Sequence, residues 1–332
     1  MARRRDPGRA PLKPEFALIE RIRARAGARA DVLLGNGDDA ALLQPPEGMG
    51  LAWSTDTLVS GVHFPADTAP ADIGFKALAV NLSDLAAMGA RPAWATLSLT
   101  LPEADADWVD GFLDGFCELA EAHDVALVGG DTTRGPLSIT VGAQGFVPAG
   151  GGLRRDGAGF NDDIWVTGTL GDAAGALRQW QAGGLQSMKL RHRLDRPSPR
   201  VDVGLAIIEL ATSAIDLSDG LRADLGHILA RSGVGAEIDL GRLPTSVTLA
   251  EHFGDEATRW RLQLAGGDDY ELCFTAPASN ALAIEQALAG CDTFATVIGR
   301  ITRENGLRCL APSGEEFAPG PDEGFAHFGG QA

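Results

Sequence analysis

Six short acidic segments separate the apolar stretches of this sequence, and each stands where a strand pattern gives way to a turn or a helix. They read NGDDA at 36–40, STDT at 54–57, NLSDL at 81–85, GGDTT at 129–133, IDLSDG at 215–220 and GGDDYEL at 266–272. One aspartate in such a place is most often a turn or N-cap residue. Six of them, several flanked by Gly, Ser and Thr, indicate hard oxygen ligands at strand ends, which suit Mg²⁺ and the phosphates that it bridges. The pattern favours metal-assisted phosphoryl transfer or ATP-dependent ligation.

Strand and helix patterns alternate through both halves of the 332-residue chain, which is longer than one core usually supports. We therefore predict two domains of α/β and α+β class. A glycine cluster at 148–152 is the expected junction. The predicted divisions are a disordered basic arm at 1–15, an N-terminal α/β domain at 16–148 and a C-terminal α+β domain at 149–332.

The periodicity also predicts the individual elements. Helices are expected at 16–26, 72–89, 103–124, 172–182 and 201–211, and a strand end running into a helix at 213–233. Strands are expected at 31–35, 50–59, 93–101, 125–133, 137–147, 235–240 and 264–276, a strand and turn at 162–171, and a loop at 191–200.

The charge of the chain restricts the classes of binding partner, and its cysteines indicate the cellular compartment. The chain carries 45 acidic and 28 basic residues, a net charge of −17, which disfavours nucleic acid and anionic membranes as partners. Its four cysteines are far apart and form no C-x-x-C pair, so neither a zinc site nor a disulfide framework is indicated. We expect a reduced, cytoplasmic setting. The N-terminal arginines lack the apolar run of a signal peptide, and no apolar stretch is long enough to cross a membrane.

The first acidic segment also has the G-x-G-x-x-G/A spacing of a dinucleotide-binding loop, through Gly35, Gly37 and Ala40. Asp38 and Asp39, however, would place two negative charges in the phosphate cradle, and the prolines at 45–46 leave room for only a very short helix. A Walker loop is excluded because none of the three lysines follows a glycine. Neither EF-hand spacing nor a G-x-S-x-G motif occurs. The segment is better interpreted as a metal-binding turn.

The motifs resemble those of the bacterial thiamine-monophosphate kinases, both in their order along the chain and in their residues. The matching stretches are GNGDDAALL, STDTLVSGVHF, ADIGFKALAVNLSDLAAMGARP, GGDTTRGPLSITV, SAIDLSDGL and GGDDYELCF. That family is part of the ATP-binding synthetase superfamily that includes aminoimidazole ribonucleotide synthetase. The resemblance implies an N-terminal mixed sheet that pairs across a homodimer and a C-terminal α+β domain. It also implies transfer of the γ-phosphoryl group of ATP to thiamine monophosphate, giving thiamine diphosphate and ADP, with several Mg²⁺ ions.

The resemblance implies the site residues as well. The expected Mg²⁺ ligands are Asp39, Ser54, Thr55, Asp56, Asp84, Asp131, Asp216 and Asp219. The expected ATP contacts are Gly130, Asp131, Arg155 and Ser218, with Arg154 open as an alternative to Arg155. The expected contacts to thiamine monophosphate are His63, Asp268 and Phe325. Adjacent Asp38 and Asp39 cannot both face one site from an extended backbone, and the family pattern favours Asp39 as the ligand and Asp38 as the turn residue.

The expected chemistry needs no catalytic general base, because the acceptor phosphate is already ionised. Cations between donor and acceptor reduce the repulsion of two phosphates, and His63 is interpreted as a hydrogen-bond donor to the acceptor. Two positions depart from the family pattern: Asp268 stands where Glu is frequent, and Phe325 where Trp or Tyr is found. Both changes bear on substrate affinity rather than on reaction type.

Two alternatives stay open. One is another ATP-dependent synthetase or maturation enzyme of the same superfamily. However, the sequence lacks both the reactive Cys and Lys loop of selenophosphate synthetases and the C-terminal Cys of hydrogenase maturation factors. The other is a regulator that binds Mg²⁺ or nucleotide without turnover.

Overall fold

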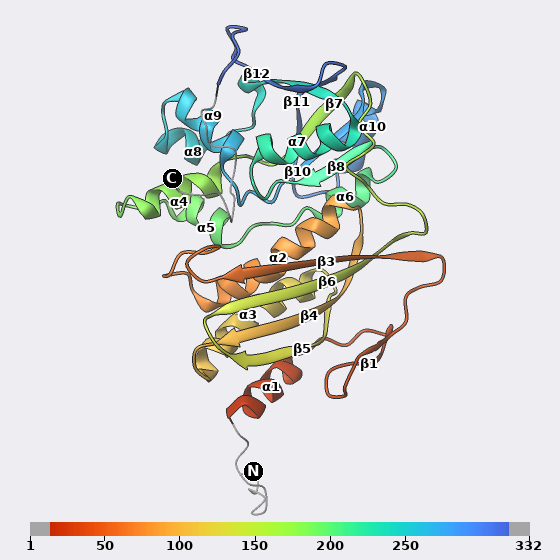
Figure 1. Cartoon of the computed structure of the whole chain (residues 1–332), viewed down its shortest axis with the longest axis vertical. Helices are drawn as coiled ribbons and strands as arrows, with labels where there is room; N and C mark the ends of the chain where they lie inside the picture. The colour runs from red at the N-terminus through yellow and green to blue at the C-terminus, as the bar shows by residue number, and fades with distance from the viewer. Residues whose placement is uncertain (1–13, 319–332) are drawn as a thin grey trace, which may run out of the picture.

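A four-stranded sheet with two helices on one face makes up the N-terminal half (Figure 1). The structure, a computed structural model, describes residues 14–318. The elements of this half are α1 (Pro14–Arg25), β1 (Val32–Leu34), β2 (Leu42–Leu43), β3 (Met49–Val59), α2 (Pro70–Ala87), β4 (Arg91–Leu101), α3 (Ala106–Ala122), β5 (Ala126–Arg134) and β6 (Ser138–Pro148). The sheet order is β3-β6-β4-β5, in which β4 and β5 are parallel and the other pairs antiparallel. The predicted mixed sheet is confirmed.

The C-terminal half is a six-stranded, mostly antiparallel sheet with helices around it. Its elements are β7 (Asp162–Thr167), α4 (Asp172–Gln181), α5 (Met188–Asp195), α6 (Val201–Ile207), β8 (Ser213–Asp216), α7 (Leu221–Ser232), β9 (Gly235–Asp239), α8 (Val247–His252), α9 (Glu256–Ala265), β10 (Leu272–Pro277), α10 (Ala281–Leu288), β11 (Ala295–Thr302) and β12 (Gly306–Leu310), with 3₁₀ turns at Leu240–Arg242 and Ala278–Asn280. The sheet order is β12-β9-β11-β7-β10-β8, and only β12 and β9 pair in parallel among these strands. This is the expected α+β class.

Helix α2 joins the two halves. Its apolar positions, among them Leu78, Leu82 and Leu85, are buried as the periodicity predicts. The cluster that they enter also contains Leu272 and Phe274 of β10, so one hydrophobic core runs from the first sheet into the second. Burial of this kind contributes about 25 cal/mol per Å² of apolar surface. The shared core fixes α2, and with it the acidic residues on its polar side, between the two sheets.

Two predicted elements differ from the structure. The expected loop at 191–200 contains most of α5, whose helix has few apolar residues and is secured instead by ion pairs and by the Ser187 N-cap. The strand expected at 264–276 begins only at Leu272: α9 extends to Ala265, and Asp268 and Tyr270 in the segment between have left-handed backbones. The strand and turn expected at 162–171 are found, with β7 ending at Thr167.

The remaining boundary predictions concern the ends of the chain and the membrane. Helix α1 begins at Pro14, so the last two residues of the expected arm are helical, and the rest of that arm lies outside the described residues. Between residues 14 and 318, no helix combines the length and the apolar character needed to cross a bilayer.

Candidate functional site

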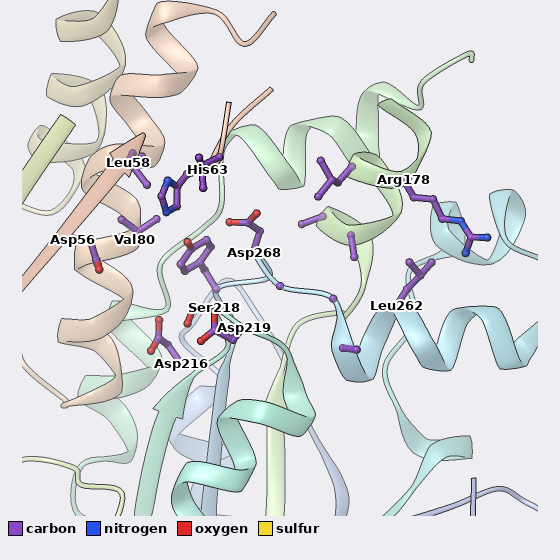
Figure 2. A pocket seen from close by; sticks show the side chains of 18 of the residues that line it. Asp56, Leu58, His63, Val80, Arg178, Asp216, Ser218, Asp219, Leu262 and Asp268 are labelled. Atoms are coloured by element: carbon purple, nitrogen blue, oxygen red, sulfur yellow. The ribbon is translucent and has the colours of Figure 1, made fainter. Parts of the chain in front are cut away.

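A cleft of about 1140 Å³ lies where the two halves meet. Its walls come from the end of β3 and the loop after it, from α2, from α4, from the turn between β8 and α7, and from the segment that joins α9 to β10. Figure 2 shows Asp56 with Asp216, Ser218 and Asp219 toward one end, His63 and Asp268 between, and Arg178 with Leu262 at the other end. The cleft is therefore acidic at one end and mixed apolar and cationic at the other.

Three carboxylates from three elements meet at the acidic end. Asp56 lies on β3, Asp84 on α2 and Asp216 at the end of β8. Ser54 donates a hydrogen bond to the Asp84 carboxylate, and the Ser83 hydroxyl donates to Asp216 at 2.8 Å. The side chain of Asn81 also accepts the backbone N–H of Asp56 at 3.2 Å. These hydrogen bonds link β3, α2 and β8 and hold the three carboxylates along the same end of the cleft.

The pKa values of these acids are raised mainly by burial, and for Asp56 and Asp216 also by neighbouring negative charge. Burial, followed by the negative charge of Asp84, raises the pKa of Asp56 to about 7. Burial also raises the pKa of Asp84, although Ser54 and the positive charge of Arg155 oppose the rise. The pKa of Asp216 is raised well above its ordinary value by burial and then by Asp84. A cation among these oxygens would relieve both effects.

The turn after β8 supplies the facing wall. Ser218 and Asp219 line the cleft, and Asp224 of α7 holds their backbone by accepting the N–H groups of Asp219 at 3.0 Å and Gly220 at 3.1 Å. Burial, opposed by the hydrogen bond from the Asp219 backbone, raises the pKa of Asp224 to about 7. Asp224 therefore shapes the turn that presents Asp219.

His63 and Asp268 lie next to each other in the middle of the cleft, which Tyr270 also lines. The Nδ1 atom of His63 accepts the backbone N–H of Val59 at 2.9 Å, so the neutral ring carries its proton on Nε2. Asp268 has a left-handed backbone with φ of 68°, and its N–H donates to the Ser218 carbonyl at 2.9 Å. Burial, followed by the charge of Asp268, raises the pKa of Tyr270 well above its ordinary value, which keeps the hydroxyl protonated.

The structure does not bring every expected residue to the cleft. Asp39 and Asp131 are exposed and lie outside its lining. Thr55 is exposed on the opposite face of β3 from Ser54 and Asp56, because side chains alternate along a strand. Any contact of Thr55 with a metal in the cleft would therefore involve its backbone. Phe325 lies outside the described residues.

The first acidic turn has the form that the sequence analysis favours over a phosphate loop. Strands β1 and β2 pair as a short antiparallel hairpin, and no helix follows them before β3. Within the turn, the Asp38 carboxylate accepts the N–H of Asp39 at 2.9 Å, as expected of a turn residue. The dinucleotide-loop interpretation is thereby excluded, and the role of Asp39 as a ligand stays a prediction.

The structure explains why position 130 is a glycine, and it distinguishes between the two candidate arginines. Gly130 has φ of +148°, and a Cβ atom there would meet the Leu97 carbonyl oxygen at 1.8 Å, so only glycine fits beside Asp131. Arg154 is engaged with Asp156 through an Nε contact of 2.9 Å. Arg155 instead acts electrostatically on Asp84 and Asp224, which favours Arg155 over Arg154 as the residue directed toward the cleft.

Several residues in or next to the cleft were not predicted. Tyr270 and Asp224 both stand inside or next to the quoted motifs, but neither is set apart there from ordinary core or helix residues. Arg178 and Arg261 line the far end of the cleft from α4 and α9. None of the quoted motifs includes them, because both helices lie outside those segments. Lys76 is a charged residue inside the apolar run FKALAV, a signal that the periodicity alone could not interpret.

The described residues contain no group of three or more His, Cys, Asp or Glu side chains placed to form a protein-only metal site. The carboxylates of the cleft are nonetheless hard oxygen donors with raised pKa values. Mg²⁺ usually retains several waters and takes only one or two carboxylates together with substrate phosphates. The donor set is compatible with that mode of binding.

Comparison with known proteins agrees with this geometry. Residues 37–147 match the family "AIR synthase related protein, N-terminal domain", and residues 161–310 match "AIR synthase related protein, C-terminal domain". The thiamine-monophosphate kinase of Escherichia coli K12 is 52% identical over 321 residues, which cover 95% of this chain and 98% of that enzyme.

Two solved structures extend the comparison. The crystal structure of thiamine-monophosphate kinase from Stenotrophomonas maltophilia K279a has a TM-score of 0.85 and 56% identity, covering 91% of this chain and 98% of that one. AaThiL complexed with AMPPCP and TMP has a TM-score of 0.74 and 31% identity, covering 97% of this chain and 100% of that one. The chain therefore belongs to the AIR synthase related family and, within it, to the thiamine-monophosphate kinases.

Proposed function

We propose that the cleft transfers the γ-phosphoryl group of ATP to the phosphate of thiamine monophosphate, giving thiamine diphosphate and ADP. An oxygen of the acceptor phosphate forms the new bond to the γ-phosphorus as the bond to the ADP oxygen breaks. The observation that carries the proposal is the single cleft that places His63 and Asp268 beside Asp56, Asp84 and Asp216. Further support comes from a relative of the same family that binds AMPPCP, an ATP analogue, together with TMP.

Mg²⁺ is the metal that suits the donor set. In this proposal Asp56, Asp84, Asp216 and Asp219, with the Ser54 hydroxyl, would hold Mg²⁺ directly or through water. Asp39, Asp131 and the backbone of Thr55 are the remaining proposed ligands. When bound, the metal would neutralise the charge of the two reacting phosphates. The raised pKa values of Asp56 and Asp216 support the assignment, because burial first and the negative charge of Asp84 second make a cation favourable there.

The remaining residues position the two substrates. Gly130, Asp131, Arg155 and Ser218 are proposed to contact ATP, and the guanidinium fork of Arg155 suits a phosphate. His63, Asp268 and Phe325 are proposed to contact thiamine monophosphate. His63 carries its neutral-state proton on Nε2 and can donate it in a hydrogen bond to the acceptor phosphate. No general base is required, because the attacking oxygen is already ionised.

The assay that tests the function incubates the protein with ATP, Mg²⁺ and thiamine monophosphate and measures thiamine diphosphate by chromatography. Product that depends on Mg²⁺ is the expected result. ATP binding without product would favour a nucleotide-binding regulator, and ATP consumption without thiamine diphosphate would favour another synthetase or maturation enzyme of the superfamily. Either of those outcomes would overturn the proposal.

We also propose a homodimer formed through the open face of the first sheet. Leu51 and Trp53 of β3 are 46% and 65% exposed on the face opposite α2. Gln144 lies directly across from Trp53 on β6, and within the described chain neither polar atom of its buried amide has a hydrogen-bond partner. An apolar face with an unpaired buried amide fits a second copy of the chain. A cytoplasmic location accords with the four cysteines, all free thiols in the structure.

A further inference from the structure

Lys76 is a fully buried cation that contacts both middle residues of the cleft. Its side chain lies on α2 and is 1% exposed. The Nζ atom is 3.0 Å from Oδ1 of Asp268 and donates a hydrogen bond to the backbone carbonyl of His63 at 3.0 Å. One ammonium group therefore touches a residue from each half of the chain.

Burial of a charge at this position requires compensation. An ammonium group taken out of water is retained only where it is paired and hydrogen-bonded. Asp195 of α5 also lies near Lys76, but Asp195 accepts hydrogen bonds from Arg191 at 2.6 Å and from Thr68 at 3.3 Å. Among the described residues, Asp268 is the acid that forms an ion pair with Lys76.

The two groups that Lys76 holds have little other support from regular structure. His63 lies in the loop after β3, and Asp268 lies in the segment between α9 and β10 with a left-handed backbone. A non-glycine residue in that conformation costs free energy, so it persists only where its surroundings hold it in place. The Asp268 side chain is 28% exposed toward the cleft, so the Lys76 contact fixes one oxygen and leaves the carboxylate accessible.

We propose that Lys76 is a positioning residue for thiamine monophosphate: it fixes the separation and orientation of His63 and Asp268, which approach the substrate from different halves of the chain. This inference rests on the proposed function, in which those two residues bind that substrate. It assigns to Lys76 an effect on the affinity for thiamine monophosphate and not on that for ATP, because the proposed ATP contacts lie on other elements.

Steady-state kinetics of Lys76→Met test the proposal, with Lys189→Met as the matched control because Lys189 is exposed on α5. For Lys76→Met we expect KM for thiamine monophosphate to rise about 10-fold or more, while kcat and KM for ATP stay within about threefold. Lys189→Met should match the wild type. In the double variant Lys76→Met/Asp268→Asn, the rise in KM for thiamine monophosphate should be smaller than the product of the two single-variant rises, because both changes remove the Lys76–Asp268 contact.

A spectroscopic readout separates positioning from a general loss of structure. Tyr270 is the only tyrosine of the chain and lines the same cleft two residues from Asp268. Protein labelled with 3-fluorotyrosine therefore gives one ¹⁹F resonance from this site. We expect Lys76→Met to shift the resonance of Tyr270. The control variant Lys189→Met should leave both that resonance and the melting temperature unchanged.

The outcomes distinguish the two proposals. A wild-type protein that makes no thiamine diphosphate contradicts the proposed function. An active wild type with an unchanged KM for thiamine monophosphate in Lys76→Met overturns the role of Lys76. So does an equal rise in KM for both substrates, because that would mark a merely structural residue. If Lys76→Met does not fold, Lys76→Gln, which keeps a hydrogen-bond donor, takes its place, and a raised KM for thiamine monophosphate with KM for ATP within about threefold of the wild type is then the required result.

Discussion

Asp131 is the acidic residue whose chemical role can be tested apart from folding, because its side chain is exposed and makes a single described hydrogen bond, from the Thr132 N–H at 2.8 Å. Asn in its place can still accept that bond. We expect Asp131→Asn to lower turnover about 100-fold or more, as the loss of one group that stabilises transition-state charge does. Thermal unfolding should be unchanged.

The control for that variant is Asp107→Asn, which alters another exposed aspartate at the start of α3, far from the cleft lining. Its turnover and unfolding temperature should equal those of the wild type. Turnover by Asp131→Asn at the wild-type rate would exclude Asp131 from the metal and ATP contacts.

At the same scale, the GGDDYEL motif shows what residue patterns can and cannot predict. The sequence predicts a site acid in this segment, and Asp268 does line the cleft. The neighbouring acids have other partners: Asp269 is buried and accepts the Gly171 N–H at 2.9 Å, and Glu271 is buried against arginines. Burial and partner identity separate these three acids, and both depend on tertiary contacts that a single motif does not contain.

At the scale of elements, Glu271 connects the cleft segment to β7, α5 and the start of α6. Its carboxylate accepts hydrogen bonds from Thr167 at 2.6 Å, Arg193 at 2.7 Å and Arg200 at 2.6 Å, and it is fully buried. Removal of its charge would leave two arginines without their partner. We expect Glu271→Gln to lower the free energy of unfolding by about 3–5 kcal/mol, the range for breaking a buried ion pair.

This cluster also predicts a pH dependence with a definite sign. Burial would raise the pKa of Glu271, but Arg200, Arg193 and Thr167 outweigh it and hold the pKa below its ordinary value of 4.5. The folded state thus binds fewer protons than the unfolded state near that pH, so this stabilisation is complete above about pH 4.5 and is lost as the pH falls through the lower folded-state value. Denaturant unfolding of wild type and Glu271→Gln at several pH values measures the difference.

The control for the cluster is Glu237→Gln, which alters an exposed pair with Arg308 on the outer strands of the second sheet. Its effect should be below about 1 kcal/mol. A difference between wild type and Glu271→Gln that stays constant from pH 7 to below pH 4 would contradict the assigned pKa direction.

The same ion pairs explain why α5 was not predicted from the sequence. The helices with an apolar face, such as α2 and α3, were predicted because their periodicity matches the core that they cover. In α5 only Leu190 and Leu194 are buried apolar residues, and Arg191 and Arg193 bind acids far away in the sequence. A helix stabilised by distant charges leaves little periodic signal in its own residues.

At the scale of the whole molecule, the fold classes were predictable, whereas the cleft was not. The alternation of patterns gives the α/β and α+β classes. The acidic segments were expected at strand ends, but Asp56 and Asp131 lie within β3 and β5, and Asp84 lies within α2. Only the shared core around α2 determines which strand ends face each other. It brings Asp56 and Asp216 to the same cleft and leaves Asp39 and Asp131 outside its lining.

Dimer formation concerns the whole molecule, and a substitution at Trp53 tests it. A charge placed on the open face of β3 would have to be buried without a partner in the proposed interface. We expect Trp53→Glu to weaken self-association by about 30-fold or more, in line with about 2 kcal/mol for a central aromatic residue. Analytical ultracentrifugation over a concentration series measures the change.

Leu282→Glu is the matched control, because Leu282 of α10 is 66% exposed, nearly the same as Trp53 at 65%, and lies in the other half of the chain. This variant should sediment as the wild type does. Equal sedimentation of all three proteins as dimers would place the interface elsewhere, and a monomeric wild type would contradict the dimer itself. A monomeric Trp53→Glu beside a dimeric Leu282→Glu is the pattern that the open sheet face predicts, because only the first substitution places a charge next to the unpaired amide of Gln144.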